Sequence, residues 1–283
     1  MFYQPQFAAL SAFSTIARSN YHSAQFSLRK RFGHDLTFDL NYTLGHSLDS
    51  ASGLQSSGSY GTAFIVNALD PDQNYASSDF DARHIINANW LWGFPFGRGK
   101  RFFSDMPSVA NAILGNWQLS GIFRWNSGLP VQTPFDGGIW ATNWNVQSNG
   151  VRISPIDSSI TRTGRPNLFS DPTAAYRSFR NARSGEVGDR NVLRGEPYVT
   201  LDLGLSKQFK FGENKSLQFR WEVFNVTNTQ RFDANTIADL GLDIDPFLSG
   251  SPSNEFGQFT STQTPLNETK AGRVMQFGLR FQF

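Results

Sequence analysis

The side chains that most often bind metals or catalyse reactions are scattered along this chain. Its four histidines, at positions 22, 34, 46 and 84, lack the close spacing of a metal site. No serine follows the pattern of a nucleophile elbow, and no pair of carboxylates stands out as an acid–base pair. Residues 93–100 contain three glycines before Lys100 but lack the spacing of a phosphate-binding loop. We therefore expect no metal, no cofactor and no enzymatic reaction.

Two groups of aspartates leave a calcium site open as an alternative. Carboxylate oxygens are ligands that Ca²⁺ prefers, but neither group follows the EF-hand pattern. We expect these residues to be solvated loop acids. They are Asp70, Asp72, Asp79 and Asp81 in one loop, and Asp239, Asp243 and Asp245 in another.

Three further charged residues belong to segments in which polar and apolar residues alternate. Asp202 lies in the segment 199–205, and Arg220 and Glu222 lie in the segment 217–223. Alternation with period two predicts β-strands, because successive side chains leave a strand on opposite sides. Opposite charges on neighbouring strands attract each other. We therefore expect these three residues to form cross-strand pairs that face a polar interior.

The end of the chain gives the clearest strand pattern. Residues 273–283 alternate almost without exception and end on an aromatic residue. A strand of about 9–11 residues with one apolar and one polar face has the length and character needed to cross a bilayer at a tilt. The apolar face carries Met275, Phe277, Leu279, Phe281 and Phe283.

Six other segments show the same alternation, so we predict seven long strands. Residues 21–47 form a hairpin around a tight turn at 33–35, and 199–223 form another with a turn at 211–215. Residues 86–94 and 117–125 are single strands joined by a glycine-containing connector, 96–116, with a basic cluster. An eighth strand within 2–17 is possible but poorly patterned.

The connections between these strands differ in length in a regular way. Short turns fall at one end of the strands, and the long polar loops 48–82, 128–197 and 229–272 fall at the other. Short periplasmic turns and long extracellular loops are typical of bacterial outer-membrane barrels. Two tryptophans of the second loop, Trp140 and Trp144, have indole rings suited to stacking on a sugar or another ligand.

Composition agrees with a membrane barrel. The chain has 283 residues, of which 14% are aromatic and 17% charged, with 27 Phe and no Cys. The charged share is below the roughly 25% of soluble domains, but no apolar run approaches the 18 or so residues of a transmembrane helix. The net charge of +2 gives no reason to expect a nucleic-acid partner. A secreted β-rich module with one large core remains the alternative.

Residues 1–13 have neither a basic start nor a small-residue cleavage site, so they are not a signal peptide. A barrel protein must be exported, and seven strands are too few to close a barrel of this kind. We therefore expect the whole chain, 1–283, to be the C-terminal arc of a larger antiparallel transmembrane β-barrel.

Several blocks, in order along the chain, carry a resemblance to a known family. They are residues 20–23 (NYHS), 41–43 (NYT), 79–84 (DFDARH), 94–100 (FPFGRGK), 116–121 (NWQLSG), 190–195 (RNVLRG) and 217–228 (LQFRWEVFNVTN), followed by Phe283. Together they resemble the C-terminal barrel of TonB-dependent receptors, particularly the Oar-like group with a carboxypeptidase-regulatory-like N-terminal domain.

This resemblance implies an energy-coupled transporter in the outer membrane of a Gram-negative bacterium. It also implies that the outer loops capture the ligand, and the candidate capture surfaces are loops 48–82, 128–197 and 229–272. Such a receptor has a barrel of 22 or more strands, an internal plug and an N-terminal segment that contacts TonB; neither the plug nor that segment is visible in this sequence. The expected partners are outer-membrane lipid, the TonB complex and the barrel-assembly machinery, and the transported ligand cannot be identified. We expect the assembly machinery to recognise the last strand through Phe277, Leu279, Phe281 and above all Phe283. The alternatives are a secreted carbohydrate-binding module and a small self-contained porin.

Overall fold

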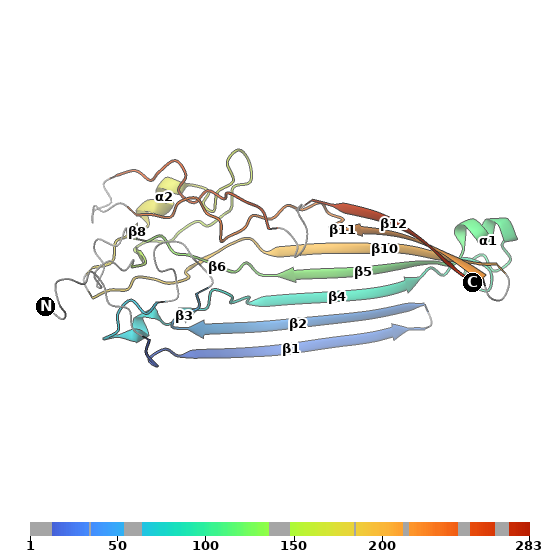
Figure 1. Cartoon of the computed structure of the whole chain (residues 1–283), viewed down its shortest axis with the longest axis horizontal. Helices are drawn as coiled ribbons and strands as arrows, with labels where there is room; N and C mark the ends of the chain where they lie inside the picture. The colour runs from blue at the N-terminus through green and yellow to red at the C-terminus, as the bar shows by residue number, and fades with distance from the viewer. Residues whose placement is uncertain are drawn as a thin grey trace.

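The computed structural model describes residues 13–33, 35–53, 64–135, 148–183, 185–211, 215–242, 250–263 and 272–283. Seven long strands form one antiparallel sheet, in which each pairs with the next long strand along the chain (Figure 1). The sheet is open, because within the described residues β1 pairs only with β2 and β12 only with β11. The strands are β1 (Ser19–Phe32), β2 (Leu36–Asp49), β4 (His84–Gly93), β5 (Trp117–Asn126), β10 (Tyr198–Phe211), β11 (Lys215–Phe224) and β12 (Val274–Gln282).

One face of the sheet carries continuous rows of apolar side chains. Residues directly opposite each other in an antiparallel pair share a face. The register places Leu28 opposite Leu40, Leu40 opposite Ala88, Ala88 opposite Phe123 and Phe123 opposite Leu201. The neighbouring rows follow the same rule. The alternation of each single strand is therefore extended by the register into an apolar belt across the sheet.

A glycine in this belt makes room for a large ring. Gly121 lies directly opposite Trp90, and a Cβ atom built on Gly121 would lie 2.1 Å from Cζ2 of Trp90. Only a residue without a side chain permits this approach. The tryptophan ring therefore lies across the backbone of β5.

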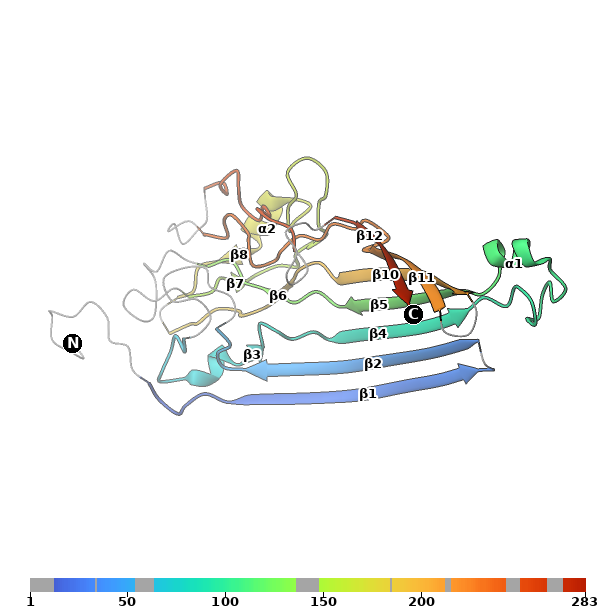
Figure 2. The same ribbon diagram turned by 45° about the vertical axis from the view of Figure 1, so that its right-hand side comes forward.

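The apolar belt is not the core of the protein. Within the described residues, Ala88 is the only buried hydrophobic residue on the seven long strands. The edge strands are the most open: Phe26 is 63% exposed and Leu279 is 72% exposed. No second layer covers this face in either view (Figures 1 and 2). Within the described residues, the apolar rows therefore do not pack inside a second layer, which the alternative of a two-layer β-rich module requires.

The buried core lies instead in the loops at one end of the sheet (Figure 1). We call the described parts of residues 50–83, 127–197 and 225–273 the loop layer. Its short elements are η2 (Pro71–Asn74), β3 (Ala76–Ser77), β6 (Pro130–Val131), β7 (Val151–Arg152), α2 (Pro172–Arg177), β8 (Phe179–Arg180) and β9 (Leu193–Arg194). Its apolar cluster includes Val131, Leu168, Phe169, Tyr176, Phe179, Leu193, Leu240, Leu242, Phe256 and Phe259.

The connector between β4 and β5, residues 94–116, lies at the opposite end of the sheet (Figure 2). It contains the helix α1 (Ser108–Leu114), which has no side-chain cap at its start. No helix in the described part of the chain is long and apolar enough to span a membrane.

The structure confirms the seven predicted strands and their all-antiparallel arrangement. The predicted eighth strand is not confirmed: residues 13–18 form no strand, and residues 1–12 lie outside the described residues. The interpretation of 128–197 as irregular was wrong in part, because this loop contributes a helix and much of the buried core. The signal for α2 was readable, since Asp171 accepts a hydrogen bond from the backbone N–H of Ala174 and Pro172 begins the helix.

Candidate functional site

The three charged strand residues lie on the face opposite the apolar belt, but only two of them meet. Arg220 donates a hydrogen bond to Glu222 of the same strand, and Gln276 of β12 donates to Glu222 over 2.5 Å. Asp202 accepts hydrogen bonds from Asn225 N at 2.8 Å and Thr200 Oγ1 at 3.2 Å. It forms no ion pair with Arg220, the one cation of the three. The expected cross-strand pairing of the three was therefore wrong, because the register places Asp202 opposite Ile122 and not opposite either charged partner.

The other predicted site residues have different outcomes. Trp140 and Trp144 lie outside the described residues. Phe277, Leu279 and Phe281 lie on the outer edge strand of the sheet and are between 55% and 72% exposed, and the terminal Phe283 is 92% exposed.

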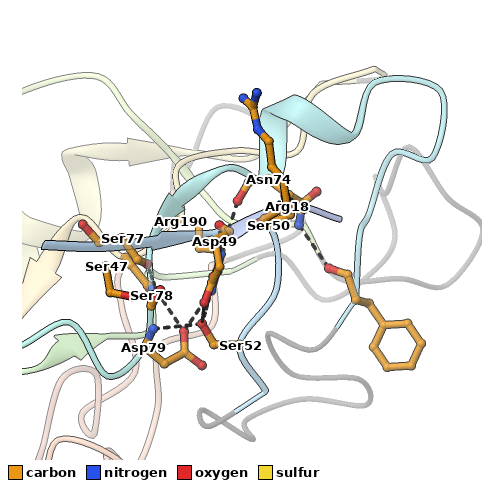
Figure 3. A network of polar contacts seen from close by, with 12 residues as sticks. Arg18, Ser47, Asp49, Ser50, Ser52, Asn74, Ser77, Ser78, Asp79 and Arg190 are labelled. Atoms are coloured by element: carbon orange, nitrogen blue, oxygen red, sulfur yellow. Dashed lines mark hydrogen bonds and ion pairs between the residues drawn. The ribbon is translucent and has the colours of Figure 1, made fainter. Parts of the chain in front are cut away.

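The most developed polar site lies at the base of the loop layer, around Arg190 (Figure 3). Its guanidinium Nη2 donates to Asp49 Oδ1 at 2.7 Å and to Ser52 Oγ at 2.7 Å, and lies 3.3 Å from Asp79 Oδ1. Its Nη1 donates to the carbonyl oxygen of Asp49 at 2.8 Å. The side chain of Arg190 is only 2% exposed, so this is a buried ion cluster and not a surface pair.

Asn191 completes the cluster from a strained backbone. Its φ of +58° lies in the left-handed region, where a side chain other than glycine is uncommon. In this conformation its Nδ2 donates to Asp79 Oδ1 at 2.8 Å and to the carbonyl oxygen of Ser77 at 2.6 Å. Both oxygens belong to the chain beside β2 and β3, so residues 190–191 hold the first loop against the second.

A second ion cluster surrounds Asp81, whose carboxylate is almost fully buried. Arg194 Nη2 donates to it at 2.5 Å, Arg83 Nε lies 3.2 Å away and His46 Nδ1 lies 3.4 Å away. The backbone N–H of Ser47 donates at 2.7 Å. Burial by itself raises the pKa of Asp81, but the hydrogen bonds from Ser47 and Arg194 outweigh it and hold the pKa below its ordinary value.

The third loop joins through Glu196. Its Oε2 accepts from the backbone N–H of Phe232 at 2.8 Å, and its Oε1 pairs with Arg162 at 2.5 Å. Next to it, Arg231 places its guanidinium 4.4 Å from the centre of the Tyr198 ring and is buried. Buried arginine and aspartate side chains thus join the first loop to the second, and the buried carboxylate of Glu196 joins the second loop to the third through the backbone N–H of Phe232.

These contacts bear on the calcium alternative. The oxygens of Asp79 and Asp81 are occupied by Arg190, Asn191 and Arg194, and Asp72 pairs with Arg18 at 3.3 Å. No group of three or more candidate metal ligands occurs among the described residues. Asp243 and Asp245 lie outside them. Three acids of the first loop, Asp72, Asp79 and Asp81, are therefore partners of arginine, whereas Asp70 accepts a hydrogen bond from Gln73 at 2.9 Å.

Sequence reasoning missed the ion clusters, although it singled out their parts. The block 79–84 was noted for a family resemblance and for its aspartates as possible calcium ligands, and the block 190–195 for the resemblance alone, and the structure brings the two blocks into contact. Asp49 and Arg190 are 141 residues apart, so no local pattern connects them. A readable signal was the match of charges: two aspartates at 79 and 81 in the first loop, and two arginines at 190 and 194 in the second.

A cavity of about 790 Å³ lies at the other end of the sheet. Its wall combines polar-face residues of the strands, such as Gln118 and Ser206, with Ser108, Asn111 and Ala112 of α1. No constellation of catalytic residues lines it among the described residues. It is a polar space under the connector.

Comparison with known proteins gives one family-level result. A profile of the family described as "Outer membrane beta barrel domain" matches residues 1–276. Among curated proteins, the large ribosomal subunit protein uL15 of Coprothermobacter proteolyticus is 35% identical over 74 residues, which are 26% of this chain. The chain spans about half the length of that relative, 48%. No solved structure matches.

Proposed function

Because the chain belongs to the outer membrane β-barrel domain family, we propose that it forms part of the wall of a TonB-dependent transporter, which takes up a ligand across the outer membrane of a Gram-negative bacterium. The observation that carries the proposal is the uncovered apolar belt. Burying apolar surface stabilises a protein by about 25 cal/mol per Å², and within the described residues no protein layer covers the belt. Hydrocarbon is the partner that fits a face of this extent.

The open sheet supports a barrel with additional strands. In lipid, each unpaired backbone group at a sheet edge costs several kcal/mol. The described chain leaves β1 and β12 with one neighbour each. We propose that further strands complete the barrel and that a plug fills it. A self-contained porin made of these strands alone is the less favoured alternative, because it would require β12 to pair with β1.

The loop layer supports ligand capture at one end of this wall. Its second and third loops share an apolar core, and two ion clusters join the first loop to the second, so the loops form one packed body at this end of the strands (Figure 2). Rigid loops bind ligands with less loss of conformational entropy than mobile ones. We propose that the loop layer faces outward and that the turns and the connector face the periplasm, as in other bacterial barrels.

The family resemblance favours energy coupling through TonB over passive diffusion. A direct test compares accumulation of a ligand, identified by mass spectrometry in protein purified from the host, in cells with and without TonB. We expect accumulation to be lost without TonB and after addition of a protonophore. Equal accumulation in both strains would reject TonB coupling, whereas recovery of the protein in the periplasm would reject the membrane location as well.

We also propose that the last strand is recognised by the barrel-assembly machinery. Phe283→Lys replaces the exposed terminal ring with a charge, and we expect the amount of protein in the outer membrane to fall several-fold. Gln282→Lys is the matched control, since Gln282 lies on the opposite face of β12, where it accepts a hydrogen bond from Ser216. Normal outer-membrane levels of Phe283→Lys would exclude this role.

A further inference from the structure

The apolar belt does not end where the strands end. From Trp92 on β4, a chain of aromatic rings continues into the connector: Trp92 to Phe94 at 4.9 Å, Phe94 to Phe96 at 6.4 Å, and Phe96 to Phe102 and Phe103 at 5.8 and 6.2 Å between ring centroids. Phe103 is 67% exposed. Exposed phenylalanines in such number are unusual for a loop in water, so the ring chain extends the surface that avoids water.

Helix α1 has two faces of opposite character. Ser108, Asn111 and Ala112 line the polar cavity. Val109 and Ile113, four residues apart and therefore on one side of the helix, are 74% and 63% exposed. Because the polar side of this short amphipathic helix faces the cavity, its apolar side is available to contact an apolar environment outside the cavity.

Cations lie beside this apolar surface. The exposed Arg98 and Arg101 form no ion pair with any described carboxylate, and the Arg101 guanidinium lies 5.5 Å from the centre of the Phe102 ring. Lys207, on an apolar row between Trp117 and Phe219, bends its amino group to the carbonyl oxygen of Asn111 in α1 at 3.3 Å. Lys207 is only 4% exposed, so its charge is held in the contact between the strand end and the connector.

We propose that the connector, residues 94–116, is an interfacial anchor that lies in the headgroup layer of the membrane leaflet at the turn end of the barrel. Its aromatic chain and the Val109–Ile113 side insert at the boundary of the acyl chains, as the apolar side of an interfacial helix does. Arg98 and Arg101 bind the phosphate groups of anionic phospholipids. A bilayer is the occupant that fits, because this surface is continuous with the belt, which already requires lipid. The inference rests on the proposed membrane wall.

The test uses the absence of cysteine in the natural chain. Val109→Cys and Ala112→Cys, made singly in the whole protein purified from the outer membrane, each receive one fluorescent label in nanodiscs. Quenching by brominated phosphatidylcholine reports contact with acyl chains, and quenching by iodide reports contact with water. We expect lipid quenching to be several-fold stronger for the label at 109, and iodide quenching to be stronger at 112.

A third label separates this inference from the proposed function. Leu201→Cys lies in the middle of the belt on β10, so a label there must be quenched by the brominated lipid if the wall spans the bilayer. Quenching at 201 together with water contact at 109 would overturn the anchor alone. Water contact at 201 would overturn both proposals. Equal lipid quenching at 109 and 112 would overturn the proposal that one side of α1 contacts lipid while the other side faces the cavity.

The charge is tested with brominated phosphatidylglycerol in place of brominated phosphatidylcholine. Attraction of anionic lipid by about fivefold per basic side chain is expected near a membrane surface. Quenching at 109 should therefore be stronger with the anionic lipid, and Arg98→Gln with Arg101→Gln should remove this excess while retaining quenching by the neutral lipid. Equal quenching by the two lipids in the unsubstituted connector would overturn the assignment of an anionic headgroup partner.

Discussion

The seven long strands, here called the strand wall, and the loop layer use the same residue types in opposite ways. In the wall, phenylalanine and leucine side chains form exposed rows, and Ala88 is the only buried hydrophobic residue of the described long strands. In the loop layer, Phe169, Phe179 and Phe256 are at most 1% exposed, and Arg190 and Asp79 are buried beside them. The wall is organised for contact with a low-dielectric solvent, whereas the loop layer is organised as a small water-soluble domain.

This difference explains why charge is tolerated in one region and not in the other. A buried ion pair is stable only if several hydrogen bonds satisfy both partners. In the loop layer, Arg190 has several such hydrogen-bond partners: two aspartates, a serine and backbone carbonyl groups surround its guanidinium. The middle of the apolar belt offers no such partners, and Lys207 at its turn end is held by the carbonyl oxygen of Asn111 in the connector. Substitutions that remove a buried charge from the loop layer, or place a charge on the belt, therefore give the sharpest tests of this difference.

The largest effect is expected from Arg190→Met. Removing one partner of a buried ion cluster typically costs about 3–5 kcal/mol, because the remaining charges stay buried. Asp49 and Asp79 would be left without their main counter-charge. We expect faster hydrogen exchange and proteolysis throughout the loop layer, with the strands still protected. Arg29→Met is the control: Arg29 is 84% exposed in its pair with Asp39, so its loss is worth about 0–1 kcal/mol. Equal effects of the two substitutions would contradict the cluster's structural role.

An effect of nearly the same size is expected from Phe169→Ala. Phe169 is fully buried and stacks on Phe256 with ring centroids 5.6 Å apart, and such truncations cost about 3–5 kcal/mol in a packed core. Phe26→Ala in the wall leaves no enclosed cavity, since Phe26 is 63% exposed. We expect loop protection to be lost only in the first variant. Comparable losses in detergent-free buffer would indicate that the wall also has a packed core.

The next largest effect is expected when a charged side chain is placed on the apolar belt. Leu203→Arg lies on the belt in the middle of β10, where a bilayer penalty of about 2–4 kcal/mol applies near the midplane. Ser206→Arg lies on the opposite face and lines the polar cavity, so it should be nearly neutral. Urea titration in lipid vesicles measures both. A Leu203→Arg variant as stable as Ser206→Arg would reject the assignment of the belt to lipid.

The smallest effect is expected from acidification of the loop layer. The pKa of Asp81 is lowered in the folded protein, so its contribution is present above the ordinary value of 3.8 and is lost as the pH falls through the lower folded value. The pKa of Glu186 is shifted in the same direction, because the hydrogen bond from Arg180 lowers it to about 2. Loop protection should be constant from neutral pH to about pH 4 and decline below it. Asp81→Asn should weaken this dependence, and an unchanged profile would exclude Asp81.

The strands could be predicted from sequence, whereas in the loop layer only α2 had a readable local signal, the cap at Asp171 followed by Pro172. Period-two alternation identified all seven long strands, because each strand places its own apolar residues on one side without help from distant residues. Helix α1 escaped prediction because it has seven residues, begins after Pro107 and has no side-chain cap. The ion clusters escaped because their partners are far apart in the chain. Tyr176 and Phe256, which meet with ring centroids 5.4 Å apart, lie in loops without any periodic pattern.

The long separation of Asp49 from Arg190 has a consequence for the order of folding. A contact between residues 141 positions apart cannot stabilise the protein until the intervening chain has folded and brought the two residues together. The entropy of closing a loop grows only as the logarithm of its length, but contacts of high sequence separation still form slowly. The hairpins β1–β2 and β10–β11 need only short closures, so they form first. Arg190 then reaches Asp49 when β2, β4, β5 and β10 are already side by side, which makes the joining of the loops a late event in maturation.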